Sequence, residues 1–237
     1  MSISEILKKQ ADSTGTKIDD SLYPKLEIYA RLLKEWNEKI NLTAITDDEG
    51  IAVKHFLDCL EIFKYVDFEK GASVIDVGTG AGFPGLVIAA AREDLNVTLL
   101  DSTGKKLKVV ADIADSMGLC NCTVLHARAE EASRKPEYRE KFDYATARAV
   151  AELRVLSEFC LPFVKKGGTF ISMKGSAAKE EAENAKNALS VLGGRIERVN
   201  TFDLCSLGER SIIEIKKISQ TSPQYPRASA KISAKPL

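Results

Sequence analysis

Apolar residues in the first part of the chain recur at the spacing of an amphipathic helix. They follow one another at intervals of four and three, at Leu22, Leu26, Tyr29, Leu33, Trp36 and Ile40. These intervals place the series on one stripe of a helix, which favours a core position for Tyr29 and Trp36 over a base-stacking surface. Asp47 or Asp48 can cap a second helix, with His55 among its inward positions, and Gly71 ends the helical region.

From residue 72 the pattern changes to short apolar runs that alternate with helical segments. The predicted strands are Ser73–Val77, Asn96–Asp101, Cys122–His126, Phe142–Ala147, Thr169–Lys174, Arg195–Leu204 and Ser211–Lys217. The predicted helices are Pro84–Ala91, Lys105–Met117, Glu152–Val164 and Ala177–Leu192. Such alternation predicts an α/β fold with a mostly parallel sheet covered on both faces. The last two strands, joined by a short SLGER loop, are expected to form an antiparallel pair at one edge.

The chain therefore divides into a helical extension (1–70), an α/β domain (71–218) and a tail (219–237). After Glu214 there is no acidic residue, whereas Lys216, Lys217, Arg227, Lys231 and Lys235 follow. The tail is rich in Ser, Pro and Lys, which predicts a mobile basic segment. Such a tail either contacts phosphates or only keeps a chain soluble, and the sequence leaves both open.

Composition narrows the class of protein. The 237 residues carry 34 Lys+Arg and 34 Asp+Glu, with 44% hydrophobic residues, which excludes global disorder and a coiled-coil rod. The chain has neither a signal-peptide core near its N-terminus nor an apolar run of the ~20 residues that a membrane helix needs. Five scattered cysteines, Cys205 among them, then indicate reduced thiols and a cytoplasmic protein. Cys120 and Cys122 lack a second ligand pair at zinc spacing, so we expect no metal.

The strongest local signal is DVGTGAGFPG, residues 76–85, between the first predicted strand and its helix. Gly78, Gly80 and Gly82 allow a sharp turn and a close approach of backbone to ligand. Asp101 ends the next strand, where a carboxylate can accept hydrogen bonds from ribose hydroxyls. Together these features predict a cofactor that contains a nucleoside.

The spacing of the glycines discriminates between cofactors. A dinucleotide fingerprint needs a third glycine where Phe83 stands, and a P-loop needs a Lys-Ser/Thr pair that is absent. A G-x-G-x-G loop after Asp76 suits S-adenosylmethionine, whose positively charged methionine end favours a nearby carboxylate. Alternatively, Asp76 serves only as a hydrogen-bond acceptor that stabilises the loop.

Several segments resemble the RsmG (GidB) family, the 16S ribosomal RNA guanine-N7 methyltransferases. They are DVGTGAGFPG, HFLDCL (55–60), LLDSTGKK (99–106), HARAEE (126–131), TARAVA (146–151) and MKG (173–175), in order between Tyr29 and Lys217. The resemblance implies a Rossmann-like, seven-stranded S-adenosylmethionine-dependent methyltransferase fold with an N-terminal helical extension. The chain departs from the family in a thinner basic tail and in Cys59, where serine is common.

The resemblance also implies cofactor contacts, at Gly78, Phe83, Ala129, Glu130 and Arg148. Ala129 and Glu130 follow the third strand, where they can meet an adenine edge; a solvated Glu130 is the alternative. Arg148 closes the fourth strand, where it can bind the cofactor carboxylate or an RNA phosphate. An ion pair of Arg148 with Asp143 or Glu152 is the alternative.

The implied reaction needs no general base, because guanine N7 carries a free lone pair. Arg148 and Lys174 are our candidate catalytic residues for steering the base, since the N7 and O6 edge accepts from cations. The partner would be 16S ribosomal RNA or a small-subunit particle, bound by a monomer. Lys105, Lys106 and Lys108 are either part of an RNA surface or a solvated helix face.

Three other functions stay open at this stage. The neutral net charge is compatible with a methyltransferase that acts on a small metabolite or a protein. A cofactor-binding regulatory module without turnover is a second alternative. A nicotinamide dehydrogenase is a third, which Phe83 in the glycine loop disfavours.

Overall fold

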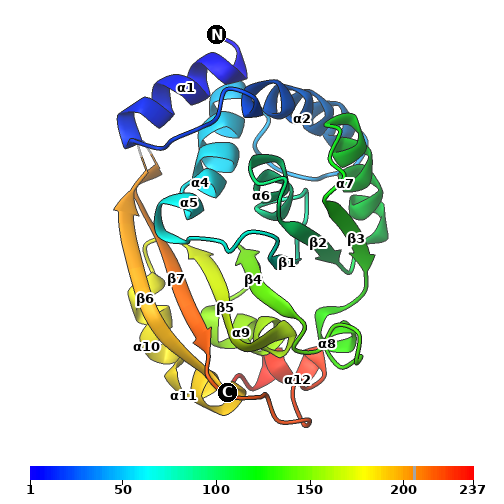
Figure 1. The fold of residues 1–237 in the computed structure, drawn as a ribbon, viewed down its shortest axis with the longest axis vertical. Coiled ribbons are helices and arrows are strands. Elements are labelled where there is room, and N and C mark those ends of the chain that lie inside the picture. Colours follow the sequence, from blue (N-terminus) through cyan, green and yellow to red (C-terminus); the bar gives the residue numbers. More distant parts are fainter. Residues whose placement is uncertain (205–206) are drawn as a thin grey trace.

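The computed structural model describes residues 1–204 and 207–237 and is drawn in Figure 1. Its described residues form a seven-stranded sheet in the order β3-β2-β1-β4-β5-β7-β6. The strands are β1 (Ser73–Val77), β2 (Asn96–Asp101), β3 (Cys122–His126), β4 (Phe142–Arg148), β5 (Val164–Lys174), β6 (Gly194–Asp203) and β7 (Glu209–Lys217). β1 to β5 pair in parallel, and β7 runs antiparallel to both β5 and β6. The predicted α/β class and the antiparallel edge pair are confirmed.

Alternating residues of the strands supply two apolar layers, one on each face of the sheet. Val74 and Leu99 belong to the layer that packs against the N-terminal helices, whereas Ile75 and Leu100 belong to the opposite layer. The first layer is covered by α1 (Ile3–Thr14), α2 (Leu22–Asn37), α6 (Gly85–Ala91) and α7 (Gly104–Ser116). The second is covered by α8 (Ala129–Ala132), α9 (Leu153–Cys160), α10 (Ala178–Asn184) and α11 (Lys186–Leu192). The N-terminal helices therefore share one core with the sheet.

The apolar stripe of α2 faces that shared core, as its spacing predicts. Leu26, Tyr29 and Leu33 are buried. Trp36 is partly buried and donates a hydrogen bond from Nε1 to Asp112 Oδ2 of α7, at 2.8 Å. The indole thus joins α2 to α7 and is not an open stacking surface.

The segment after Asp47 is helical but less regular than predicted. The Asp47 side chain accepts from the Gly50 N–H at 2.7 Å and caps α3 (Asp48–Gly50). A π-helix, η1 (Ile51–Leu57), follows, and then α4 (Asp58–Leu60) and α5 (Ile62–Tyr65). π-helical turns are rare, and those that do occur are frequently located at functional sites. The spacing of apolar residues did not distinguish this π-helix from an α-helix.

The largest differences from the predicted elements lie between α9 and α11, whereas the bounds of the other strands in the second half differ by at most two residues. α9 ends at Cys160, and a 3₁₀ turn, η2 (Leu161–Phe163), leads into β5 before the predicted strand start. Pro162 lacks an N–H and cannot continue an α-helix. The predicted helix Ala177–Leu192 is two helices, α10 and α11, and nothing in the sequence marks the break between them.

The tail was expected to be mobile, but in the structure it packs against the body of the protein. It carries α12 (Ser229–Ala234), which lies beside α9 (Figure 1). Thr221 and Ile232 are buried, and Arg227 forms an ion pair with Glu158. The prediction of a mobile tail relied on the average composition of the segment. Average composition does not reveal single contacts such as those of Thr221, Arg227 and Ile232.

The described cysteines Cys59, Cys120, Cys122 and Cys160 are free thiols, whereas Cys205 and the first residue of the SLGER loop lie outside the described residues. In the described part of the chain, no helix is both long and apolar enough to span a bilayer.

One buried carboxylate links the centre of the sheet to the glycine loop. Asp76, on β1, is completely buried and accepts from the Gly85 N–H at 2.9 Å and from the Thr146 hydroxyl at 3.1 Å. Gly85 begins α6, and Thr146 is the register partner of Asp76 on β4. Burial raises the pKa of Asp76 to about 6. A single side chain therefore joins β1, β4 and the start of α6.

Leu26→Ala tests whether α2 is part of the cooperative core. Leu26 is completely buried, so the truncation leaves a cavity and is expected to lower the free energy of unfolding by about 2–5 kcal/mol. The matched control Arg31→Ala, on the exposed face of α2, is expected to change it by less than about 0.5 kcal/mol. Urea unfolding measures both. A loss below about 1 kcal/mol for Leu26→Ala would contradict the shared core.

Asp76→Asn tests the burial of the carboxylate through pH. Because the native pKa is raised, the unfolded chain loses this proton first, and the native state holds more protons between pH 4 and 6. Stability contributed by Asp76 is therefore complete below about pH 4 and falls by about 3 kcal/mol as pH rises through about 6. The amide oxygen of Asn can still accept from Gly85, and the Thr146 hydroxyl can accept from the amide nitrogen.

The measurement is urea unfolding of both proteins at pH 4, 5, 6 and 7. As the pH rises, Asp76→Asn is expected to become more stable relative to the wild-type protein. A difference that is constant over this range would show that Asp76 does not titrate as a buried group.

Candidate functional site

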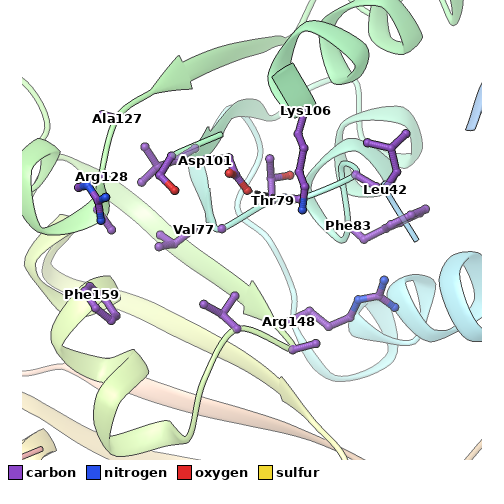
Figure 2. A pocket seen from close by; sticks show the side chains of 18 of the residues that line it. Leu42, Val77, Thr79, Phe83, Asp101, Lys106, Ala127, Arg128, Arg148 and Phe159 are labelled. Carbon is purple, nitrogen blue, oxygen red and sulfur yellow. Dashed lines mark hydrogen bonds between the residues drawn. The ribbon is translucent and has the colours of Figure 1, made fainter. Parts of the chain in front are cut away.

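A cavity of about 500 Å³ lies at the carboxyl ends of the parallel strands (Figure 2). Its lining comes mainly from the loop after β1, the ends of β2 and β4, the loop after β3, η1 and the segment before α3, with single residues from α7, α9 and α12. Ligands of open α/β sheets bind at this edge. We call it the first cavity.

The glycine loop forms the floor of the first cavity and needs glycine for two different reasons. Gly78 has φ +77°, and a Cβ there would lie 2.9 Å from a methyl carbon of Val150. Gly82 has φ +105°, and a Cβ there would lie 2.5 Å from the Tyr29 hydroxyl oxygen. Both positions combine a left-handed backbone with a close neighbour, so a side chain at either would displace the loop.

Asp101 faces the middle of the first cavity and also holds the loop (Figure 2). Its Oδ2 accepts from the Gly80 N–H at 2.9 Å, and its Oδ1 accepts from the Thr103 N–H at 2.8 Å. A carboxylate has about four acceptor sites, so two remain for hydroxyl groups of a ligand.

Three stacked rings connect the N-terminal helices to the loop. Phe83 lies between Tyr29, with ring centroids 5.0 Å apart, and His55, with centroids 4.4 Å apart. The Tyr29 hydroxyl donates to the Ala81 carbonyl at 2.7 Å. These contacts place an aromatic wall at one end of the first cavity.

His55 is held as a neutral ring. Arg148 can only donate, and its NH2 lies 3.2 Å from His55 Nδ1, so Nδ1 accepts and Nε2 carries the hydrogen that faces Thr43 Oγ1 at 2.9 Å. Burial, and then the positive charge of Arg148, lower the pKa of His55 to about 4. The ring is therefore uncharged at neutral pH, and both nitrogens are engaged.

Arg148 forms a buried ion pair that the sequence analysis did not anticipate. Its NH1 donates to Asp58 Oδ2 at 2.7 Å and to the Lys54 carbonyl at 2.9 Å, and its guanidinium carbon lies 5.1 Å from the centre of the Phe83 ring. The two partners considered from the sequence are engaged elsewhere, since Asp143 pairs with Lys165 and Glu152 with Arg154. Asp58 lies in the HFLDCL segment, but no spacing signal connects it to Arg148.

A second cavity, of about 700 Å³, adjoins the first. The two share His55, Arg148, Ala149 and Val150. Ala149 has φ +56°, a conformation that non-glycine residues seldom adopt and that is found at functional sites. The shared wall is thus one strained turn, one neutral ring and one buried cation.

Three further cations line the second cavity, namely the exposed Lys54 and two that have carboxylate partners, Lys174 and Arg210. Lys174 is nearly buried, ion-paired with Glu181 at 2.7 Å and bonded to the Ala151 carbonyl. Arg210 is more exposed, and its Nε lies 3.6 Å from Asp58 Oδ1. The carboxylate of Asp58 therefore lies between Arg148 and Arg210.

The structure gathers most of the predicted site residues around the first cavity. Those in its lining are Gly78, Gly80, Phe83, Asp101, Ala129, Glu130 and Arg148. Asp76 and Gly82 lie outside the lining: Asp76 is buried beneath the loop and holds it, which was the alternative considered for it, and Gly82 packs against Tyr29. Lys174 lines only the second cavity.

The sequence analysis missed several lining residues, namely Leu42, Thr43, His55, Lys106, Phe159 and Ser229. Lys106 turns toward the first cavity, whereas Lys105 and Lys108 are exposed elsewhere on α7, so the three lysines do not form one surface. The lysines belong to an identifiable helix, but the other residues come from distant segments with no pattern in common. Within the described residues, no group of three or more His, Cys, Asp or Glu could hold a metal ion.

Comparison with solved structures shows the fold. The 16S rRNA (adenine(1408)-N(1))-methyltransferase of Catenulisporales acidiphilia superposes with a TM-score of 0.54 at 14% identity, over 65% of this chain and 88% of that one. TYW2 of M. jannaschii, solved in complex with AdoMet, superposes with a TM-score of 0.51 at 13% identity, over 63% of this chain and 71% of that one. The fold is therefore that of Rossmann-like methyltransferases.

Comparison of sequences shows the family. A protein of Clostridium perfringens named ribosomal RNA small subunit methyltransferase G is 47% identical over 238 residues, which span 100% of both chains. Residues 22–213 match the family model GidB, described as rRNA small subunit methyltransferase G. The chain therefore belongs to the GidB family of ribosomal RNA small subunit methyltransferases.

Proposed function

We propose that this protein transfers a methyl group from S-adenosylmethionine to N7 of a guanine in 16S ribosomal RNA. The observation that carries the proposal is the pair of adjoining cavities, which share His55, Arg148, Ala149 and Val150 at the carboxyl edge of the sheet. Methyl transfer requires the methyl donor and the acceptor to bind next to each other, and two cavities with a shared wall allow this. The relatives named for small-subunit ribosomal RNA favour that acceptor over a metabolite or a protein.

The residues of the first cavity fit the cofactor. Gly78 and Gly80 allow the backbone to approach it, and Asp101 retains acceptor sites suited to ribose hydroxyls. Ala129 and Glu130 lie after β3, where they suit an adenine edge, and Phe83 lies at the opposite end with Arg148. When bound, S-adenosylmethionine supplies an electrophilic methyl group on a sulfonium.

The residues at the wall shared by the two cavities present neither an unbalanced charge nor a catalytic base. His55 is neutral with both nitrogens engaged, so it neither repels a sulfonium nor acts as a base. Guanine N7 already carries a lone pair, so no base is needed. The charge of Arg148 is balanced by Asp58. We therefore assign Arg148 and His55 a positioning role at the boundary.

The second cavity would receive the guanine. Its N7 and O6 edge is a pair of acceptors, which arginine or lysine can bind. Lys174 is tied to Glu181 and Ala151, so it shapes the turn after β4. Arg210 is more exposed than Lys174 and, unlike the exposed Lys54, has a planar fork of donors that can bind both acceptors. We assign Arg210 the direct contact with the base. The acceptor is free 16S ribosomal RNA or a small-subunit particle, and one copy of the chain binds it.

Incubation with tritiated S-adenosylmethionine and either small-subunit particles or free 16S ribosomal RNA tests the proposed reaction. The particles should come from a strain that lacks the modification. We expect label in the RNA as 7-methylguanosine at one nucleotide, identified by nuclease digestion and mass spectrometry. Label on another base, or only on protein, would overturn the proposed acceptor.

Arg210→Ala tests the second cavity. We expect kcat/KM for the RNA to fall by about 10- to 100-fold, since a good arginine–guanine pair contributes about 1–3 kcal/mol. The affinity for S-adenosylmethionine, measured by calorimetry, should stay within about twofold because Arg210 does not line the first cavity. Arg195→Ala, an exposed arginine of β6 outside both cavities, is the matched control. Equal activity of the two variants would contradict the assignment.

A further inference from the structure

The last twenty residues, 218–237, follow a fixed path over the protein; we call them the C-terminal strap. Two arginines hold this path through the backbone. Arg139 donates to the carbonyls of Thr221, Ser222 and Tyr225, and Arg134 donates to those of Pro223, Gln224 and Pro226. Six consecutive carbonyls are thus bound, whatever side chains they carry.

A buried ion pair anchors the second half of the strap. The carboxylate of Glu158, on α9, is completely buried and receives the Arg227 guanidinium in a bidentate contact, with NH2 to Oε2 at 2.6 Å and Nε to Oε1 at 2.9 Å. The Arg227 backbone N–H also donates to Oε1, at 2.7 Å. The side chain of Ile232, the fourth residue of α12, is completely buried as well. These contacts fix α12 against α9.

The anchored helix reaches the first cavity. Ser229 of α12 lines it, together with Phe159, which follows Glu158 in α9. Figure 2 shows Phe159 and Arg128 on one side of the cavity, opposite Phe83 and Arg148. This end therefore contains a ring from α9, a hydroxyl from the strap and the segment after β3.

The two ends of the first cavity are not equivalent. The end with Arg148 opens onto the second cavity, so a methyl group to be transferred must lie there. In S-adenosylmethionine the adenine is the part separated from the methyl by the ribose, and Asp101 lies between the two ends (Figure 2). The adenine therefore belongs at the end formed by Phe159 and Ser229. An apolar ring beside a hydroxyl suits a flat base with a polar edge.

We propose that the C-terminal strap is part of the cofactor site, where Ser229 and α12 close the adenine end and raise affinity for the adenosine portion. This inference rests on the proposed function, because it takes S-adenosylmethionine as the ligand of the first cavity. The strap lies beyond residue 213, where the family match ends. The match to the clostridial relative, in contrast, continues through it.

Ser229→Trp and Ser233→Trp form a matched pair of variants on α12. Ser229 lines the first cavity, whereas Ser233 is exposed and lines neither cavity. Calorimetry with S-adenosylmethionine and with 5′-methylthioadenosine, which lacks the amino acid portion, is the measurement. For Ser229→Trp we expect both affinities to fall by about tenfold or more and by the same factor, and for Ser233→Trp we expect wild-type affinities. Unchanged binding by Ser229→Trp would overturn the proposal.

A chain that ends at Arg227 gives a second test. It lacks α12 but keeps the six bound carbonyls and the ion pair with Glu158. We expect the affinities for both ligands to fall by the same factor, about threefold or more. A cooperative thermal transition would show that the truncated protein is folded. Wild-type affinity in this folded truncation would overturn the proposal. If the truncation does not fold, the two tryptophan variants decide.

The wild-type protein separates this inference from the proposed function. No binding of S-adenosylmethionine by the wild-type chain would refute the proposed function and the inference with it. Binding that the strap variants leave unchanged would refute the inference alone. Wild-type binding that Ser229→Trp weakens, without any methylation of RNA, would support the strap and refute the proposed acceptor.

Discussion

The site depends on one buried carboxylate at the centre of the sheet. Asp76 accepts from the first amide of α6 and from the Thr146 hydroxyl of β4, so the glycine loop between β1 and α6 has a defined course. A charge in this position is costly to bury, and the raised pKa of Asp76 reflects that cost. The loop amide of Gly80 is then held by Asp101, which leaves a concave backbone surface at the edge of the sheet.

The N-terminal helices complete this edge. Tyr29 and His55 stack on either side of Phe83, and Asp58 balances the buried charge of Arg148. These contacts hold His55 and Arg148, which line both cavities, so the helical extension and the sheet form one site. The neutral state of His55 follows from the same contacts, because burial and the neighbouring guanidinium both disfavour a second positive charge.

Local pattern predicted much of the fold but little of what joins distant segments. The bounds of β1, β2 and β3 and the places of Gly78, Gly80 and Asp101 follow from short apolar runs and glycine spacing, which act over a few residues. The Asp58–Arg148 pair joins residues 90 apart in the chain, and the packed strap rests on single anchors such as Arg227. No periodicity or composition encodes such pairings, because they arise only once the sheet has ordered the chain.

In the proposed arrangement, the first cavity holds the methyl donor with its reactive end at the wall shared with the second cavity. A crystal structure of the protein with S-adenosylhomocysteine would reveal this placement. We expect the ribose hydroxyls on Asp101, the adenine beside Phe159, and the sulfur at the end with Phe83 and Arg148. A ligand bound elsewhere, or bound with its adenine next to Arg148, would rule out this arrangement.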